Sequence, residues 1–518
     1  MKLPSFPKTY NTYFVASIAT IGGMLFGFDI SSMSAIIPTD QYINYYNNPA
    51  GTLQGGISAA LAGGSIVGCL VAGPLSDRLG RRDSSMVAAW FWMVGTAIQV
   101  GNQGYASLIV GRVVNGICVG ITSSQVPVWL AEIAKKERRG TIIVIQQLAI
   151  EWGILIMYFI GYGCSFIAGE WSFRTAWALQ WVPCVGLICG LPFLPRSPRW
   201  LATKDRLEEA IDVLSKIQAH GDRTDPLVIA EWEDITATIA AERSGGKGFS
   251  LFYKNGLWKR TLTGFSAQAW QQLAGANVMT YYITYVFEMA GLTGNINLVS
   301  SGVNDAVFVI CTIIVFPLAD KFGRRPMLVC GAIGMGICHF VIGGCLGSYG
   351  IAVPGGVDGN ANVTIKVDGA ASRVVIAFSY LMMVVYGLTL APMCWVYAAE
   401  IWSNETRAKG MAWSALGNWI FNFALGFFIP PAFRNIKWKT YITFGVLCMG
   451  AATHFYFGFP ETCGKTLEEI EFLFGKDAPP PWKTYRGGSR LDQHVQEVKE
   501  DVEKGVHRAS ITQVEAVV

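Results

Sequence analysis

Charged residues are scarce in this 518-residue chain. Asp, Glu, Lys and Arg together make up only 15% of it, whereas apolar residues make up 52%. That balance excludes an ordinary water-soluble enzyme, and a net charge of only +4 without a strongly basic domain argues against a nucleic-acid partner. Because a bilayer core about 30 Å thick needs roughly 20 apolar residues per helical span, the composition predicts that most of the chain lies in lipid.

Signals of catalysis and of metal binding are also missing. The five histidines do not cluster, and no phosphate-binding loop or nucleophile-bearing turn is present. The twelve cysteines nearly all fall inside or at the ends of apolar runs without paired ligand spacing, which favours small core residues over disulfides or a metal site. The first apolar run, from Tyr13 past Ile30, has no cleavage site and predicts a retained helix. We therefore expect no enzyme and neither a metal nor a cofactor.

Apolar runs of membrane-spanning length recur along the chain. Since lipid offers no hydrogen-bond partners, each run must satisfy its own backbone, as helices do. The predicted fold class is therefore an all-α polytopic membrane protein with twelve transmembrane helices. The predicted spans are 13–37, 53–75, 84–104, 106–131, 141–166, 175–194, 260–287, 297–319, 327–349, 372–399, 408–432 and 439–459.

Two motifs recur at matching positions after these spans. The sequence Asp-Arg-Leu-Gly-Arg-Arg at 77–82 returns as Asp-Lys-Phe-Gly-Arg-Arg at 320–325. Glu132 with Arg139 likewise returns as Glu400 with Arg407. This duplication predicts two pseudo-symmetric six-helix bundles around a midplane site. The predicted domains are an N-terminal bundle (1–194), a cytoplasmic helical linker (195–259), a C-terminal bundle (260–459) and a cytoplasmic tail (460–518).

The basic residues predict the orientation of the chain. Lys and Arg are concentrated in the loops that follow the even-numbered spans, and positive loops stay cytoplasmic. Both termini and the linker are therefore predicted to be cytoplasmic, in a multi-pass protein of the plasma membrane. In the predicted external loop, Asn362 begins an Asn-Val-Thr glycosylation acceptor, whereas the acceptor at Asn404 faces the cytoplasm.

The repeated charged motifs have two interpretations. Positive-inside charge alone would explain the arginines, but it would not require the aspartate, the glycine or the distant Glu and Arg. We favour a cytoplasmic gate of two ion-pair clusters, one in each half, which hold one packing and break in the other. The first cluster is predicted to contain Asp77, Arg81, Arg82, Glu132 and Arg139, and the second Asp320, Arg324, Arg325, Glu400 and Arg407.

Three charged residues lie deep within predicted spans: Asp29 in the first, Arg112 in the fourth and Glu151 in the fifth. Intramembrane charges are costly and are therefore functional candidates. Asp29 and Arg112 form either an ion pair that only locks helices, or a protonatable carboxylate whose proton affinity depends on the arginine. The second interpretation is the chemistry of a proton symporter. Glu151 either extends this relay or completes a polar patch.

Amides and tryptophans converge on several spans. Amides both donate and accept hydrogen bonds, as a neutral polyhydroxyl ligand requires, and indole rings offer flat apolar faces. The alternative is helix packing, in which amides bond across helices and tryptophans fill space. The predicted substrate-binding residues are Gln147, Gln271, Gln272, Asn277, Trp395, Asn418 and Trp419, with Gln146 and Asn422 as further amides.

Four motifs give the chain a resemblance to the sugar porters of the major facilitator superfamily. They are Gly111-Arg112, the Gln-Gln-Leu-Ala-Gly-Ala-Asn run at 271–277, Pro-Arg-Ser-Pro-Arg at 195–199 and Pro-Glu-Thr-Cys-Gly at 460–464. The resemblance implies the major facilitator fold and transport by alternating access. It also implies that 195–259 is a helical bundle that stabilises the outward-facing closure, and that the pair matching Asp29 and Arg112 carries the proton. The positions that it implies as lining the sugar site are Gln147, Gln271, Gln272, Asn277, Trp395 and Asn418.

The chain departs from that family pattern at several positions. Arg196 replaces the usual glutamate of the linker motif, and Cys463 replaces a common lysine of the last motif. The stretch from Tyr386 to Trp395 lacks the glycine-proline pairs of many members, and Glu151 replaces an apolar residue of the glucose facilitators. These departures bear on the gate, on substrate choice and on coupling.

Together these features predict proton-coupled symport of a monosaccharide, hexose or pentose, into a fungal cell. The alternatives are a passive sugar facilitator, a polyol or quinate porter, and a transporter-like sugar sensor. Quinate would ask for a second deep cation besides Arg112, and sensors tend to have longer tails than 460–518. The expected partners are a monosaccharide, a proton and the lipid bilayer, with no nucleic acid, and the protein is expected to be monomeric.

Overall fold

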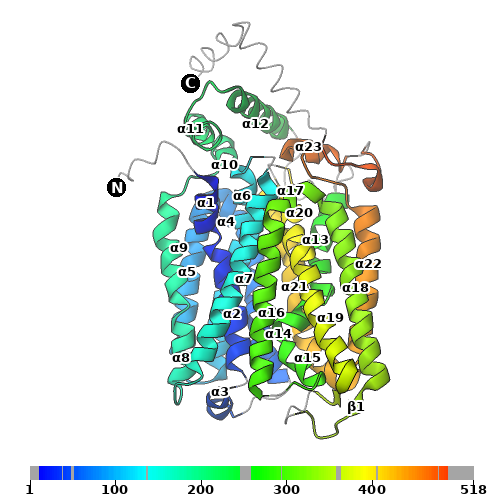
Figure 1. Ribbon diagram of the computed structural model, residues 1–518. Coiled ribbons are helices and arrows are strands. Elements are labelled where there is room, and N and C mark those ends of the chain that lie inside the picture. The colour runs from blue at the N-terminus through cyan, green and yellow to red at the C-terminus, as the bar shows by residue number, and fades with distance from the viewer. Residues whose placement is uncertain are drawn as a thin grey trace.

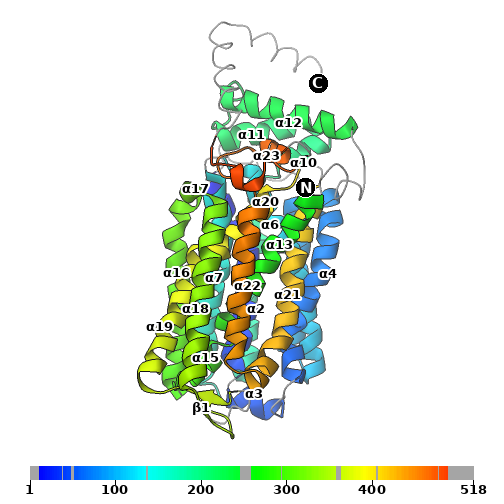
Figure 2. The ribbon, with the colours of Figure 1, turned by 90° about the vertical axis from the view of Figure 1, so that its right-hand side faces the viewer.

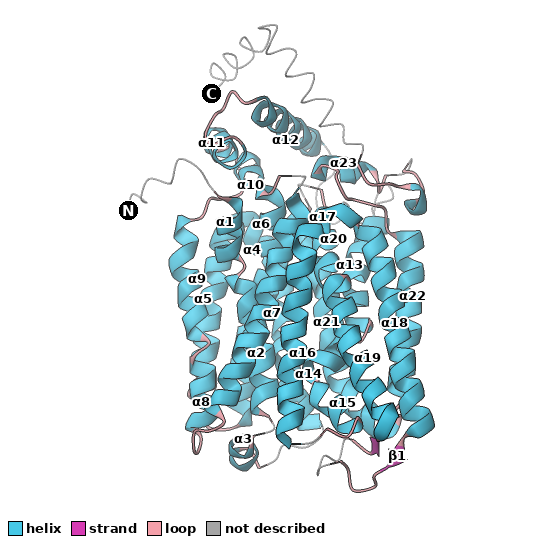
Figure 3. Ribbon diagram, in the orientation of Figure 1, coloured by secondary structure: helices cyan, strands magenta, loops and turns pink. Residues whose placement is uncertain are grey.

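The computed structural model describes residues 11–37, 39–47, 52–135, 138–244, 258–292, 294–357, 363–403, 406–475 and 478–487. Helices dominate this part of the chain (Figure 3), as the sequence predicts. Its one sheet consists of β1 (Ile351–Ala352) and β2 (Ile365–Lys366), paired antiparallel. The expectation of an essentially helical protein is therefore confirmed.

The helices that precede residue 194 pack on one another. They are α1 (Thr12–Ala19), α2 (Ile21–Ile36), α3 (Asp40–Tyr45), α4 (Thr52–Leu79), α5 (Arg81–Val100), α6 (Tyr105–Ile133), α7 (Arg139–Cys164), α8 (Trp171–Ala178), α9 (Trp181–Gly190) and the 3-10 turn η2 (Leu191–Phe193). Contacts are closest between α4 and α6, where a Cβ on Gly116 would strike the Leu61 carbonyl oxygen. Small residues thus let these two backbones approach, as in helix pairs within membranes.

The helices from residue 258 to 458 form the other side of the molecule (Figure 1). They are α13 (Trp258–Leu273), α14 (Ala276–Tyr281), α15 (Ile283–Met289), α16 (Gly294–Val315), η5 (Phe316–Leu318), α17 (Ala319–Phe322), α18 (Arg324–Tyr349), α19 (Gly369–Leu388), α20 (Leu390–Glu400), α21 (Arg407–Asn435) and α22 (Lys439–Gly458). Gly275 separates α13 from α14 with a φ of +81°, which favours glycine. The break frees the Ala274 carbonyl, which lies 2.9 Å from His339 Nε2.

A smaller set of helices lies at one end of the molecule, which we call the linker end (Figures 1 and 2). It consists of α10 (Pro198–Thr203), α11 (Leu207–Gln218), α12 (Pro226–Ser244), α23 (Leu467–Phe472) and the turn η6 (Pro481–Lys483). Helix α3 and the two-stranded sheet lie at the opposite end. The long helices run between the two ends.

Nine helical stretches of the described chain are long and apolar enough to cross a membrane. They coincide with all the predicted spans except 84–104, 260–287 and 439–459. Those three segments are nevertheless helical: they fall on α5, on the broken unit α13–α15 and on α22. Polar residues at the start of α5 and within α13 reduce the hydropathy of two of them, so length and composition identify them less clearly.

Candidate functional site

Four buried amides join α13 to α21. Asn418 Nδ2 donates to Gln268 Oε1 and to Gln271 Oε1, each at 2.8 Å, and Asn418 Oδ1 accepts from Gln272 Nε2 at 3.0 Å. The three glutamines share one face of α13, because residues three and four apart are neighbours on a helix. Of the predicted amides, the structure therefore brings Gln271, Gln272 and Asn418 together. It adds Gln268, which the spacing from Gln271 and Gln272 could have identified.

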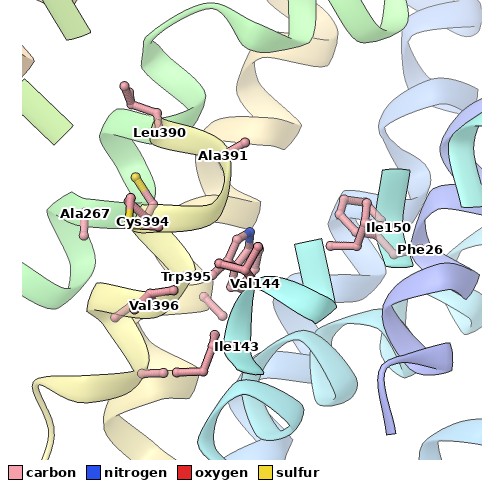
Figure 4. Close-up of a cluster of buried hydrophobic side chains, with 14 of the residues drawn as sticks. Phe26, Ile143, Val144, Ile150, Ala267, Leu390, Ala391, Cys394, Trp395 and Val396 are labelled. Atoms are coloured by element: carbon pink, nitrogen blue, oxygen red, sulfur yellow. The ribbon is translucent and has the colours of Figure 1, made fainter. Parts of the chain in front are cut away.

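The same network holds α20. Gln271 Nε2 donates to the Ala391 carbonyl at 2.8 Å, and Gln268 Nε2 to the Cys394 carbonyl at 3.2 Å. Trp395, one residue beyond Cys394, is only 3% exposed and belongs to a hydrophobic cluster shared by α20 and α7. Figure 4 shows its side chain beside Val144 of α7. The amide network thus fixes the segment that positions this indole.

Some buried amide atoms have no hydrogen-bond partner within the described chain. They include Gln272 Oε1 and both polar atoms of Gln146, together with atoms of other amides outside the predicted set, such as Gln99 and Gln180. Burial of an unsatisfied amide is costly, so a water or the hydroxyl groups of a ligand would be favoured there. A neutral polyhydroxyl molecule could form hydrogen bonds with these unpartnered amide atoms.

Trp419 bridges the two sides of the molecule. Its Nε1 donates to Ser123 Oγ of α6 at 3.2 Å, and its ring meets Phe26 of α2 edge-on, with 4.8 Å between centroids. The residue is fully buried. In this conformation the predicted ligand platform therefore acts as a contact between α21 and the first helices.

Asp29 and Arg112 form a buried ion pair. Asp29 Oδ2 lies 3.0 Å from an Arg112 terminal nitrogen, and the two side chains are 0% and 1% exposed. Arg112 also donates through Nε to the Ile57 carbonyl of α4 at 2.9 Å. The structure therefore brings together the two charges that the sequence proposes as a proton pair, and it gives the guanidinium a second anchor.

Glu151 lies apart from that ion pair, at the contact between α7 and α16. Its Oε1 accepts from Gln147 Nε2 at 2.9 Å and from Thr312 Oγ1 of α16 at 2.8 Å. Its Oε2 is buried without a hydrogen-bond partner among the residues with a described environment. Glu151 thus engages the amide donor of Gln147 on its own helix and joins α7 to α16 through Thr312.

At the linker end, Glu132 is shared by arginines from both motif copies. Arg81 approaches Glu132 Oε1 at 2.9 Å, and Arg407 of α21 approaches the same oxygen at 3.6 Å. Arg407, which is predicted to belong to the second cluster, thus also pairs with a carboxylate of the first cluster. Equivalent motifs end at the same face of the molecule, where a partner from the other half is as near as one from its own.

Asp320, from the second motif copy, likewise contacts the first half of the molecule. Its carboxylate accepts from the backbone N–H of Gly140 at 3.0 Å and of Thr141 at 2.8 Å, at the first turn of α7. It also pairs with Arg324 at 2.7 Å. Asp77, in turn, pairs with Lys409 of α21 at 3.0 Å rather than within its predicted cluster. Both repeated aspartates thus bind the other side of the molecule.

The remaining gate residues bind either their own half or the segment after α22. Arg324 pairs with Glu400 at 2.9 Å, as predicted. Arg82 pairs with Asp83, Arg139 donates to the Lys465 carbonyl, and Arg325 donates to the carbonyls of Pro481 and Thr484. The two predicted clusters are therefore one crossed network, extended by the segment after α22.

Two of the departures from the family pattern, Arg196 and Cys463, make side-chain contacts at the linker end. Arg196 pairs with Asp83 at 2.9 Å, at the start of α5. Cys463 Sγ lies 2.9 Å from an Arg324 terminal nitrogen. Glu461, by contrast, accepts from the backbone N–H of Arg324 and Arg325 and so caps α18. The equivalent helices α5 and α18 are thus stabilised at their first turns by different side chains.

Three predicted features cannot be compared with the structure. The side chain of Asn277 and the acceptors at Asn362 and Asn404 lie outside the described residues. One buried charge, in turn, escaped the sequence analysis: Asp305 of α16 is 6% exposed. A carboxylate inside the predicted span 297–319 was the available signal.

Comparison with known proteins identifies the family. Residues 15–474 match the family model described as "Sugar (and other) transporter". The chain is 46% identical to the high-affinity glucose transporter of Kluyveromyces lactis, covering 92% of this chain and 88% of that protein. It is 44% identical to the high-affinity glucose transporter 1 of Candida albicans, covering 93% and 89%.

Solved structures agree with this match. A proton:xylose symporter bound to 6-bromo-6-deoxy-D-glucose has a TM-score of 0.76 at 25% identity, covering 90% of this chain and 100% of that one. The inward-open xylose transporter of E. coli has a TM-score of 0.65 at 25% identity, covering 89% and 100%. The chain therefore belongs to the sugar transporter family of the major facilitator superfamily and is a membrane transporter, not an enzyme.

Proposed function

We propose that this transporter carries a monosaccharide, with a hexose as the first candidate, into the cell together with a proton. The observation that carries the coupling is the fully buried Asp29–Arg112 pair. A titratable group in the membrane interior is a functional candidate by default. The two fungal relatives are described as glucose transporters, and the similar symporter is bound to a glucose analogue, which together support a hexose.

The proposed body has twelve spans in two six-helix bundles. The first bundle (1–194) consists of α1–α2, α4, α5, α6, α7 and α8–α9, and the second (260–459) of α13–α15, α16–α17, α18, α19–α20, α21 and α22. The linker (195–259) contains α10–α12. The excess of basic residues supports a cytoplasmic linker end and tail (460–518), in the plasma membrane.

The proposed sugar site lies between the bundles. Gln271, Gln272 and Asn418 would bind hydroxyl groups, Trp395 would face the ring, and Gln147 would be released from Glu151 when a ligand competes for its amide. The unsatisfied Gln272 Oε1 supports this assignment, because it is buried next to the saturated network. Asn277 and Trp419 complete the proposed set.

Proton coupling would follow from the two anchors of Arg112. With Asp29 ionised, the guanidinium is held between the carboxylate and the Ile57 carbonyl. Protonation of Asp29 would neutralise the carboxylate of α2 and break its ion pair with Arg112. Arg112 would then keep only its hydrogen bond to the Ile57 carbonyl of α4. Loss of one partner from a buried ion pair costs about 3–5 kcal/mol, enough to change the packing of α2 against α6.

The described conformation is proposed to be closed on the cytoplasmic side. The contacts of Glu132 with Arg407, and of Asp320 with the start of α7, join the bundles there. The TM-score is higher with the analogue-bound symporter (0.76) than with the inward-open transporter (0.65), which supports the same assignment. Opening would break this crossed network.

The coupling is tested by Asp29→Asn in proteoliposomes. We expect the unmodified protein to accumulate glucose when the outside is acidic and to stop when a protonophore is added. The variant should lose accumulation, while exchange of labelled for unlabelled sugar persists at a reduced rate, because exchange needs no proton gradient. Undiminished accumulation by the variant would refute the assignment of Asp29. Absence of accumulation by the unmodified protein would instead indicate a passive facilitator.

A further inference from the structure

A second buried carboxylate lies outside the mechanism proposed above. Asp305 belongs to α16, within the stretch Val299–Phe322 that is long and apolar enough to cross a membrane. The residue is 6% exposed. In the part of the chain that the structure describes, no ion pair joins it to a basic side chain, whereas Asp29 has Arg112.

The surroundings of Asp305 are uncharged. The neighbouring Asn304 is an uncharged amide that is also buried, and Tyr158 of α7 interacts electrostatically with Asp305 across the α7–α16 contact. The Tyr158 ring packs against α16, where a Cβ on Gly302 would lie 3.2 Å from Tyr158 Cε1. Asn304 Nδ2 in turn donates to the Met279 carbonyl of α14 at 3.4 Å.

The titratable groups on the helices packed against α16 include no cation close to Asp305. Arg373, a basic residue of α19, is exposed near the start of that helix. Arg139, the first residue of α7, donates to the Lys465 carbonyl at the linker end. The other titratable groups are carboxyls, phenols and one thiol: Glu151, Tyr158, Tyr162 and Cys164 of α7, Tyr380 and Tyr386 of α19, and Tyr285 and Glu288 of α15.

Asp305 is one of two carboxylates along the same contact. Glu151 of α7 accepts a hydrogen bond from Thr312 of α16, and the ring of Tyr158 of α7 lies against Gly302 of α16, near Asp305 in the sequence. Glu151 and Tyr158, like Thr312 and Asp305, are about two turns apart on their helix, so the two carboxylates lie at successive levels of the contact between α7 and α16. Figures 1 and 2 both show α7 and α16 side by side.

An ionised carboxylate without a cation is unstable in such surroundings, whereas the protonated acid can be satisfied by neutral hydrogen bonds. We propose that Asp305 is a second proton-binding site of the transporter, protonated while α7 and α16 are in contact and able to ionise when their separation admits water. This inference rests on the proposed alternating access. It differs from the role of Asp29, because water rather than an arginine would control the proton.

The proposal is tested by infrared spectroscopy of the full chain in lipid at about pH 7, where an ordinary aspartate is ionised. We expect a carbonyl band of a protonated carboxylic acid that shifts in D2O and disappears in Asp305→Asn. Asp29→Asn and Glu151→Gln should retain that component. Asp368→Asn, which alters an exposed aspartate near β2, is the matched control and should leave the spectrum unchanged.

Sugar exchange gives the second measurement. Above the pH at which Asp305 loses its proton, the rate of sugar exchange should change by up to about tenfold per pH unit, as expected for one titrating group. Asp305→Asn should remove this dependence from the plot of exchange rate against pH. If that variant does not fold, Asp305→Glu should move the infrared band, and Tyr158→Phe should shift it by removing the phenol. A spectrum and a pH profile unchanged by Asp305→Asn would overturn the proposal, as would a profile set by Na⁺ instead of pH. Because the band is read without a gradient, its presence would stand even if coupled uptake failed.

Discussion

Among the individual residues, Asn418 connects the largest part of the buried amide network. Its one side chain amide serves three glutamines, and two of them in turn hold carbonyls of α20. Alanine at this position would leave several buried amide atoms without partners. Each such loss costs about 1–3 kcal/mol.

We therefore predict that Asn418→Ala raises the KM for glucose exchange at least about tenfold, since about 1.4 kcal/mol corresponds to a factor of ten. It should also lower the thermal unfolding temperature in detergent. Thr443→Ala, which removes an exposed hydroxyl bonded only to its own helix, is the control. An Asn418 variant with an unchanged KM and unchanged stability would show that the network serves neither binding nor packing.

Most residues of the buried amide network could be predicted from the sequence, and the omissions have physical causes. The chemistry of amides, which suits hydroxyl ligands, predicts Gln271, Gln272 and Asn418, but Gln268 was missed because it lies before the motif at 271–277. Asp305 was missed because its span was assigned from its apolar neighbours. The partners of Trp419 could not be derived, since they belong to helices far away in the sequence. The partner of Gln147 is instead Glu151, one turn away on the same helix.

Helix α7 shows how one element depends on the other bundle. Its first turn offers backbone N–H groups that have no partner within the helix, and Asp320 accepts from those of Gly140 and Thr141. Such a charged cap contributes about 1–2 kcal/mol. Asp77, its counterpart in the first motif copy, instead pairs with Lys409, and both side chains are about one third to one half exposed.

We predict that Asp320→Asn speeds hydrogen exchange at the first turn of α7 by about fivefold to thirtyfold, the factor that 1–2 kcal/mol represents. Asp77→Asn is the matched control, because an exposed ion pair contributes only about 0–1 kcal/mol. It should leave the start of α7 unchanged. Equal effects of the two variants, measured by mass spectrometry of peptides covering that turn, would contradict the capping role.

The crossed gate also marks the limit of prediction at the level of elements. Lipid requires helices, so the spans followed from hydropathy. The duplicated motifs revealed which loops are equivalent, but equivalence does not say which loops touch. Only the arrangement of the helices brings Arg407 to Glu132 and Asp320 to Gly140.

For the whole molecule, the asymmetry of the two halves bears on substrate choice. The buried amide network belongs to the second half, and the one deep ion pair of the described spans belongs to the first. Arg112 is already occupied by Asp29, so no free cation is offered there to an anionic ligand. This favours a neutral substrate.

We therefore predict that proteoliposomes exchange labelled glucose faster than quinate by at least about tenfold, because an unpaired buried carboxylate costs several kcal/mol. Labelled hexoses, pentoses, polyols and quinate should be compared at one concentration and one pH. Empty liposomes are the control for leakage. Quinate exchange equal to that of glucose would contradict the neutral site.

The bridge made by Trp419 has an optical consequence. Its indole lies in dry surroundings, bonded to Ser123 and edge-on to Phe26, and both partners belong to the opposite half. Parting of the halves must therefore wet this ring and shift its emission to longer wavelength. Although the chain has 17 tryptophans, the component lost on Trp419→Phe would belong to this contact alone. Each transport cycle would thus carry its own fluorescent signal, without an attached dye.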